Sequence, residues 1–175
     1  MNVLFLGDSI TEAFRPEAYF PGMNVVNHGI SGLSSEELSQ IIEPEWFSNE
    51  PDIVFLCIGT NDIARGFAAE KTNSFIKLLI AFIREYTKKG TAIYLISLFP
   101  TRNNPPRPNH LINRLNQILH ETSLQWETSY LHLTPYFSDQ NGELLADFTD
   151  DGLHLTHKAY EHWRDLLLPL IRDRS

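Results

Sequence analysis

Short apolar runs that each end within two residues of a glycine or proline are the feature of this sequence that most restricts its fold. Between them lie stretches whose apolar residues recur at helical spacing, so strand and helix alternate about five times along the chain. The expected strands span residues 3–6, 24–27, 53–58, 92–98 and 130–133. Near-continuous apolar strands that alternate with amphipathic helices predict an α/β fold with a parallel sheet covered on both faces.

The expected helices have apolar stripes over residues 38–42, 75–86, 111–119 and 160–171. Residues 34–37 offer caps before the first stripe, Gly90 offers a stop after the second, and Asn109 offers a cap before the third. No internal repeat, low-complexity tract or linker interrupts this order. The sequence therefore predicts a single domain over residues 1–175.

Charge and composition exclude several classes of protein. A formal net charge of -8 repels phosphate backbones and makes a nucleic-acid partner unfavourable. No apolar stretch is long enough for a membrane span. The single cysteine, Cys57, lies in the apolar run 53–58, where a buried strand residue is expected, and no intramolecular disulfide can form. The first residues lack the basic start and long apolar core of a signal peptide, so a cytoplasmic location is expected.

Polar, glycine-bearing segments follow the first three expected strands. Gly7-Asp8-Ser9 follows the first strand, Asn27 to Gly32 the second, and Gly59 to Asp62 the third. In open parallel sheets, functional sites form beyond the carboxyl ends of the strands. The chemistry of this chain is therefore expected in these segments.

Ser9 and the segment 151–154 offer the parts of a nucleophilic centre. Ser9 falls in the first strand-to-helix turn, where a hydroxyl can project above the sheet, although Ser9 or Thr11 could instead cap a helix. Asp151 precedes His154 by three residues, a spacing that lets a carboxylate bond the imidazole and fix its tautomer. The imidazole could then accept the serine proton.

The second and third polar segments offer hydrogen-bond donors for an oxyanion. Asn61 carries a side-chain amide just after a central strand, and Gly32 can present its backbone N–H to a substrate at close range. Ordinary turn residues are the alternative interpretation of both.

Taken together, four segments resemble the sequence blocks of the SGNH hydrolases, also called the GDSL esterase and lipase family. They are Gly7-Asp8-Ser9-Ile10, Asn27-His28-Gly29-Ile30-Ser31-Gly32, Gly59-Thr60-Asn61-Asp62 and Asp151-Gly152-Leu153-His154. The blocks stand in the family's order and cover nearly the whole chain. The resemblance implies a three-layer α/β/α sandwich that is flavodoxin-like, with a five-stranded parallel sheet.

By the same resemblance, Ser9 is the nucleophile, His154 the general base and acid, and Asp151 the residue that orients His154. The oxyanion hole would consist of the Ser9 N–H, the Gly32 N–H and the Asn61 side chain, with Gly29 as a second candidate glycine. Asp8 is expected to shape the nucleophile turn. The implied mechanism needs no cofactor and no metal.

Two further segments resemble the platelet-activating-factor acetylhydrolase-like branch of the family. They are Leu98 to Arg102 and Leu153 to Thr156, although His157 stands where a proline often follows in relatives. The branch implies a serine esterase acting on small acyl esters, acetyl above all, through an acyl-enzyme. Carbohydrate deacetylation and thioester hydrolysis use the same mechanism and stay open, as does a homodimer.

Three other interpretations of these residues are less favourable. His154, His157 and His162 could hold zinc with Asp151, but the His-Glu-x-x-His pattern is missing. A flavodoxin-like module that binds nucleotide or flavin is disfavoured because Asp8 would stand beside a phosphate. A catalytically silent relative is the third alternative. His28 could line the second loop. Arg65 and Arg102 could face an anionic leaving group but are expected on the solvated surface. The aromatic residues that could shape a pocket, but that are expected in the core, are Phe14, Phe20, Trp46, Phe67 and Phe99.

Overall fold

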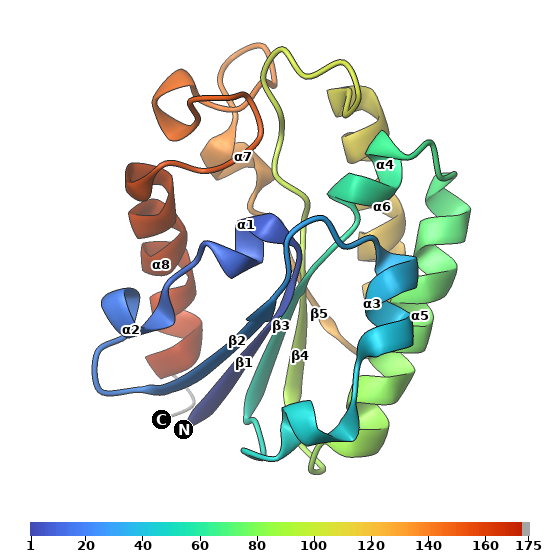
Figure 1. The fold of residues 1–175 in the computed structure, drawn as a ribbon, viewed down its shortest axis with the longest axis vertical. Coiled ribbons are helices and arrows are strands. Elements are labelled where there is room, and N and C mark those ends of the chain that lie inside the picture. The colour runs from blue at the N-terminus through green and yellow to red at the C-terminus, as the bar shows by residue number, and fades with distance from the viewer. Residues whose placement is uncertain (173–175) are drawn as a thin grey trace.

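The computed structural model describes residues 1–172, which form a five-stranded parallel sheet with helices on both faces (Figure 1). The strand order β2-β1-β3-β4-β5 is that of flavodoxin-like doubly wound sheets. The strands are β1 (Asn2–Gly7), β2 (Asn24–Gly29), β3 (Ile53–Cys57), β4 (Ala92–Ile96) and β5 (Ser129–Leu131). The expected α/β/α sandwich with five parallel strands is confirmed.

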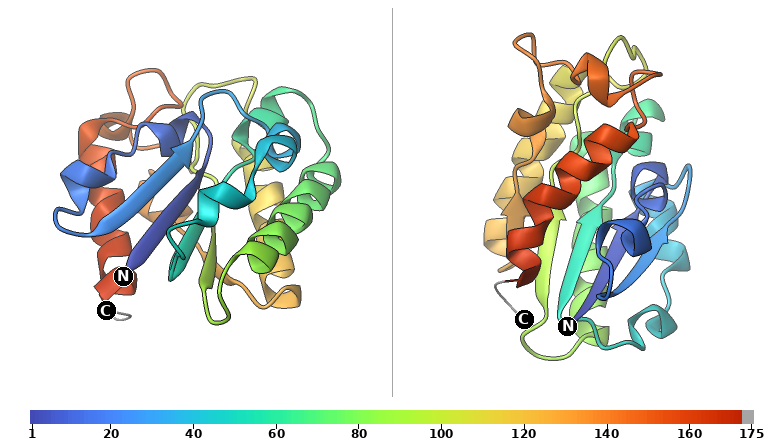
Figure 2. Two further views of the ribbon diagram at one scale, coloured as in Figure 1. Left: turned by 60° about the horizontal axis from the view of Figure 1, so that its bottom comes forward. Right: turned by 90° about the vertical axis from the view of Figure 1, so that its left-hand side faces the viewer.

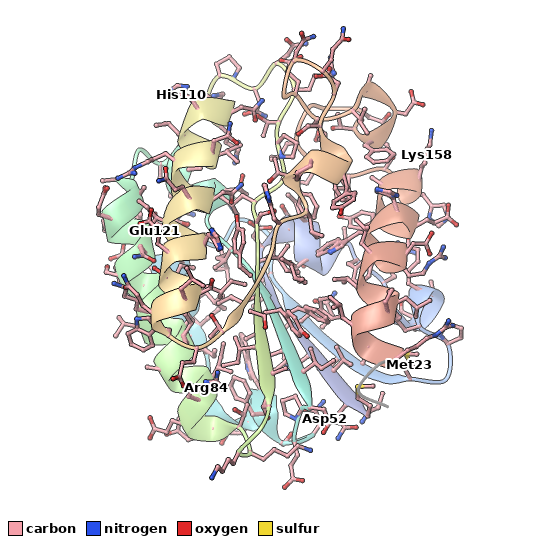
Figure 3. The ribbon with its side chains drawn as sticks, turned by 180° about the vertical axis from the view of Figure 1, so that it is seen from behind. Met23, Asp52, Arg84, His110, Glu121 and Lys158 are labelled. Atoms are coloured by element: carbon pink, nitrogen blue, oxygen red, sulfur yellow. The ribbon has the colours of Figure 1, made fainter. Side chains whose placement is uncertain are left out.

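The helices divide into two layers, which the views of Figure 2 separate. One layer contains α1 (Ser9–Glu12), α2 (Pro16–Tyr19), α7 (Thr134–Phe137), the 3-10 turn η2 (Ala146–Phe148) and α8 (His157–Arg172). The other contains α3 (Ser35–Ile41), the 3-10 turn η1 (Pro44–Phe47), α4 (Thr60–Ala64), α5 (Ala69–Tyr86) and α6 (Asn109–Gln125). In Figure 3, α6 with His110 and Glu121 and α8 with Lys158 stand on opposite sides of the strands.

Alternation of side chains along the strands divides the core in the same way. In β1, Val3 and Phe5 face the α8 layer, whereas Leu4 and Leu6 face the α5 layer. Both faces are apolar because helices cover both, as expected of a parallel sheet. Trp163 of α8 is fully buried, and its ring centroid lies 5.0 Å from that of Phe99. This packing fixes α8 on the sheet and so positions the loop before it.

Several expected element ends differ from the observed ones; β4, for example, ends at Ile96 instead of residue 98. Three differences have a clear structural cause. β5 stops at Leu131 instead of residue 133, because Leu133 turns back to bond the Leu131 carbonyl and precedes α7. Asn109 does not cap α6, since its side chain exchanges two hydrogen bonds of 2.8 Å with the backbone of Thr101. The helix before Gly90 already ends at Tyr86, so Gly90 belongs to the following turn. By contrast, the cap expected within residues 34–37 is confirmed as a capping box of Ser34 and Glu37.

Cys57 is buried in β3, as expected of a strand residue, and burial raises the pKa of its thiol well above the usual value. A thiolate is therefore disfavoured at this position. Within residues 1–172, no helix combines the length and the apolar character needed to cross a bilayer.

Candidate active site

The turn between β1 and α1 brings Ser9 to the carboxyl edge of the sheet. β1 ends at Gly7, where a Cβ would overlap the Cys57 carbonyl and the Thr11 side chain, so only glycine fits. Asp8 caps α1 by accepting a hydrogen bond of 3.0 Å from the Ile10 N–H. The alternative of Ser9 or Thr11 as the cap is therefore wrong. The Ser9 side chain is left free for other contacts.

Ser9, His154 and Asp151 form a continuous series of hydrogen bonds. Ser9 Oγ lies 3.1 Å from His154 Nε2, and His154 Nδ1 lies 2.6 Å from Asp151 Oδ2. An ionised carboxylate only accepts, so the proton of the imidazole must sit on Nδ1 and the Nε2 lone pair must face Ser9. Such a series can take a proton from the serine hydroxyl and return it to a leaving group.

Asp151 is held in its charged form by several donors. Partial burial alone would raise its pKa, but the His154 ring and the backbone N–H groups of Leu153 and His154 outweigh burial and lower the pKa to about 2. Asp151 is therefore a carboxylate throughout the neutral range, as the tautomer of His154 requires.

The loop that carries Asp151 and His154 lies between η2 and α8 and is held at Gly152 by two hydrogen bonds. The Gly152 N–H donates to Thr149 Oγ1 at 2.9 Å, and the Gly152 carbonyl accepts from the Arg102 N–H at 2.8 Å. The Arg102 side chain is itself engaged by the carboxylates of Asp139 and Glu143. Arg102 therefore holds the loop through its backbone and does not face an anionic leaving group.

Two backbone donors near Ser9 have no partner within residues 1–172. Neither the Ser9 N–H nor the Gly32 N–H donates to any acceptor there. Gly32 adopts a φ of +82°, a conformation that favours glycine. Gly29 is different, because its N–H donates to Asn27 Oδ1 at 2.8 Å and a Cβ would overlap the Glu12 backbone. Gly29 is thus needed for packing against α1, and Gly32 is the glycine with a free donor.

Asn61 and Asp62, at the start of α4, attach the segment of Gly32 to the sheet edge. Asn61 Nδ2 donates to the Leu33 carbonyl at 2.9 Å, which leaves the second N–H of that amide for another acceptor. The fully buried Asp62 accepts from the Ser35 N–H at 2.9 Å and from Ser35 Oγ at 2.5 Å. The donors predicted for an oxyanion are therefore built on two segments that hold each other.

Arg65 supports this segment from outside. Its guanidinium pairs with Glu37 at 2.7 Å and donates to the Gly32 carbonyl at 2.9 Å. The expectation of a solvated surface arginine describes its exposure but misses this contact. The side chain holds the Gly32 loop and is not free for a ligand.

Arg107 is a site residue that the sequence did not single out. Its Nη2 donates to Asn61 Oδ1 at 2.9 Å, and its charge acts on Asp8 and Asp151. The signal that could have found it is its position on the loop after β4, which ends at the same sheet edge as the other site segments.

The environment of Asp8 makes its charge unfavourable. Burial raises the pKa of Asp8 to about 7, against the opposing effects of the Ile10 N–H and of Arg107. Asp8 therefore exchanges its proton near neutral pH directly beside Ser9.

The other histidines considered for a site lie apart. His157 Nδ1 is 2.9 Å from the Tyr19 hydroxyl, while His162 packs on Phe137 and Phe148. Within residues 1–172, no three His, Cys, Asp or Glu side chains are grouped as a metal site would need.

The candidate pocket residues divide between core and surface. Phe14, Phe20 and Phe99 belong to the buried core, whereas Phe67 is partly exposed beneath the Lys71 ammonium. His28 lies in β2 rather than in the loop after it, stacked on Trp46 with centroids 4.6 Å apart.

Comparison with known proteins identifies the family and supports the fold. A family model described as the GDSL-like lipase/acylhydrolase family matches residues 5–162. A protein of Streptococcus pneumoniae, provisionally described as a platelet activating factor, is 28% identical, with a TM-score of 0.84 over 97% of this chain and 83% of its own. An acylhydrolase-type structure from Bacteroides fragilis has a TM-score of 0.85 at 21% identity, over 99% and 87% of the two chains, and supports the fold.

One curated relative is named for an activity other than ester hydrolysis. The N-acylneuraminate cytidylyltransferase of Escherichia coli O18:K1:H7 is 34% identical over 142 residues, which are 79% of this chain and 33% of that protein. This chain spans about a third of the length of the curated relatives that it matches.

Proposed function

Because the chain belongs to the GDSL-like lipase/acylhydrolase family and is therefore a hydrolase, we propose that it is a serine esterase for small acyl esters, acetyl above all. The observation that carries the proposal is the series of hydrogen bonds from Ser9 through His154 to Asp151. The family match alone indicates the reaction class, whereas this series indicates which hydroxyl attacks. Residues 1–175 would act as one catalytic domain.

The first half of the reaction forms an acyl-enzyme. Ser9 Oγ attacks the ester carbonyl carbon while His154 Nε2 takes the hydroxyl proton, and Asp151 stabilises the resulting imidazolium. The negative charge on the carbonyl oxygen is received by the N–H groups of Ser9 and Gly32 and by the Asn61 amide. When the tetrahedral intermediate collapses, the alcohol leaves with the proton held by His154.

The second half regenerates the enzyme. A water molecule gives its proton to His154 Nε2 and attacks the acyl carbon that is bound to Ser9. The same donors receive the oxyanion, and Ser9 Oγ leaves with the proton from His154, which releases the acid. No step requires a cofactor, and the chain's own donors are sufficient for both halves.

Hydrolysis of p-nitrophenyl esters from acetyl to octanoyl tests this proposal. Wild type should prefer acetyl, and Ser9→Ala and His154→Ala should lose turnover by several orders of magnitude while staying folded. A fluorophosphonate probe should label wild type but not Ser9→Ala. Unchanged turnover in a folded Ser9→Ala variant would overturn the nucleophile assignment. Failure of wild type to label would instead favour a silent, ligand-binding member of the family.

One observation favours an acylated sugar as the ester. The relatives named N-acylneuraminate cytidylyltransferase have an N-acylated sugar acid in their name, and they share 27 to 34% identity with this chain. Because an N-acyl group is an amide, the ester proposed for this chain is an O-acyl group on a sugar of that class. Nucleotidyl transfer is disfavoured for this chain, because Asp8 places a buried carboxyl where a phosphate would need hydrogen-bond donors. Carbohydrate deacetylation is therefore the second candidate. It is tested by release of acetate from O-acetylated sugar acids compared with p-nitrophenyl acetate and an acetyl thioester.

The location and assembly of the enzyme are part of the proposal. The one cysteine, Cys57, is a buried free thiol, which suits a reducing compartment such as the cytoplasm. A homodimer is proposed from the family resemblance only. Fractionation of the source cell and light scattering of the purified protein test the two points separately.

A further inference from the structure

The side-chain amide of Asn61 has a single allowed orientation in this structure. Its oxygen atom faces Arg107 Nη2 at 2.9 Å, and its nitrogen atom faces the Leu33 carbonyl at 2.9 Å. A guanidinium can only donate and a carbonyl can only accept. The two partners therefore exclude the flipped amide, which would bring donor against donor and acceptor against acceptor.

The environment of Arg107 is unusual for an arginine. The guanidinium is half-buried, and its Nε is buried without a hydrogen-bond partner. Within residues 1–172, no carboxylate lies within ion-pair distance of it. The other arginines near the site, Arg65 and Arg102, are both paired with carboxylates. Burying part of a cation whose only side-chain hydrogen bond, in the part of the chain that the structure describes, goes to one amide oxygen costs free energy. We therefore expect the contact between Arg107 and Asn61 to contribute to the function of the site.

From this contact we infer that Arg107 is a positioning residue that fixes and polarises the Asn61 amide as an oxyanion donor. The positive charge draws electron density toward Asn61 Oδ1, so the N–H that is not used by Leu33 becomes a stronger donor. The inference rests on the proposed esterase function. According to this inference, Arg107 acts through Asn61 and does not touch the substrate.

The Gly32 segment extends the effect of this contact. Asn61 Nδ2 holds the carbonyl of Leu33, the residue next to Gly32. Loss of Arg107 would free the amide to rotate, and both the side-chain donor and the adjacent backbone donor would then lose their common support. An electrostatic arrangement of this kind is effective only when its dipoles are held before the reaction begins.

A double-mutant cycle on p-nitrophenyl acetate tests the inference. Asn61→Ala should lower kcat about 100- to 1000-fold, the usual effect of losing one oxyanion donor. Arg107→Met should lower kcat about 10- to 100-fold with KM nearly unchanged, and Arg107→Lys should recover part of the loss. The double variant Asn61→Ala/Arg107→Met should be little slower than Asn61→Ala alone, because the inferred effect of Arg107 passes through Asn61 and only its longer-range charge effect on Asp8 and Asp151 remains. Effects that multiply in the double variant would overturn the inference.

The matched control is Arg114→Met, which removes an exposed arginine paired with Glu70 on α6 and should leave kcat at the wild-type value. If Arg107→Met does not fold, the cycle is measured with Arg107→Lys. A comparison with 4-acetoxybenzoate excludes direct recognition of an anion. If Arg107→Met raised KM for that anionic ester alone and spared p-nitrophenyl acetate, Arg107 would be a substrate-binding residue and the inference would be wrong.

The two proposals fail in different ways. Turnover that survives in Ser9→Ala removes the esterase mechanism and this inference with it. Turnover that is lost in Ser9→Ala and Asn61→Ala but retained in folded Arg107→Met removes this inference alone.

Discussion

Gly152 lies directly against the backbone carbonyl of Arg102, with no room between them for a side chain. The contact joins the loop after β4 to the loop that carries Asp151 and His154, and a hydrogen bond of 2.8 Å from the Arg102 N–H to the Gly152 carbonyl accompanies it. Gly152 also adopts a φ of +83°. Both the space and the backbone conformation therefore require glycine at this position.

Gly152→Ala is expected to destabilise the protein and to slow the reaction. The left-handed backbone costs about 1–2 kcal/mol for alanine, and the overlap with Arg102 adds to this cost by forcing the loops apart. His154 would move with the loop, so kcat should fall as well. Urea denaturation measures the first effect and p-nitrophenyl acetate hydrolysis the second.

Gly142→Ala is the matched control for this change. Gly142 has a similar φ of +76°, but no atom lies close to the position of its Cβ. The Gly142→Ala variant should be destabilised only by the cost of the left-handed backbone, and its activity should stay at the wild-type value. Equal losses of stability in the two variants would mean that the overlap with Arg102 does not contribute to the cost of Gly152→Ala.

Asp151→Asn should leave the loop in place but shift the proton of the His154 imidazole to the wrong nitrogen atom. An asparagine amide can present its nitrogen to Nδ1, which favours the tautomer with the proton on Nε2, facing Ser9. Loss of the corresponding carboxylate in serine hydrolases costs roughly 10⁴-fold in kcat. Steady-state kinetics and circular dichroism on the same preparation check the outcome. A loss of less than tenfold in a folded variant would show that Asp151 does not control the tautomer.

The three central strands, β1, β3 and β4, were predictable because they are buried on both faces and therefore form apolar runs in the sequence. β5 was harder, since it has three residues and lies at the edge of the sheet, where only part of each side chain is covered. Likewise, the polar segments after β1, β2 and β3 were predictable because parallel strands bring their carboxyl ends to one edge.

The contributions of Arg107 and Asn109 were not predictable from spacing. Both depend on how the loop after β4 folds back over the site, and that path is set by contacts between Thr101 and Asn109 and between Arg102 and Gly152. These contacts depend on the tertiary path of the loop and not on the spacing of residues within any motif. The choice between Gly29 and Gly32 also needed the structure, because it depends on which N–H is already used by Asn27.

Ser35→Ala tests the attachment of the Gly32 segment to α4. The variant removes the hydroxyl that donates to the fully buried Asp62, and it leaves that carboxyl oxygen without its partner. Loss of a hydrogen bond to a buried charged group costs about 1.5–3 kcal/mol. Because the same segment carries Gly32, kcat should fall too.

Ser39→Ala is the control on the same helix. Its hydroxyl donates to the Glu36 carbonyl at the partly exposed surface, so its removal should cost well under 1 kcal/mol and leave kcat unchanged. Urea titrations of both variants give the comparison. If Ser35→Ala were as stable and as active as Ser39→Ala, the contact with Asp62 would not support the site.

The raised pKa of Asp8 predicts how stability changes with pH. In the unfolded chain this carboxyl titrates near its usual value of 3.8, whereas burial raises its folded-state pKa to about 7. Below about pH 4 both states hold the proton, and Asp8 has no unfavourable effect. Between about pH 4 and 7 only the folded state holds it, so the free energy of unfolding falls as pH rises. Above about pH 7 the loss is complete and corresponds to roughly 4 kcal/mol.

Asp8→Asn removes this titration while its amide oxygen can still accept from the Ile10 N–H. The free energy of unfolding of the variant relative to wild type should therefore increase steadily from pH 4 to pH 7 and then level off. Any constant cost of burying the asparagine NH₂ group offsets this difference by the same amount at every pH and does not change its dependence on pH. Guanidinium denaturation at pH 4 to 8 measures it. Parallel curves for the two proteins would mean that Asp8 keeps an ordinary pKa in the folded state.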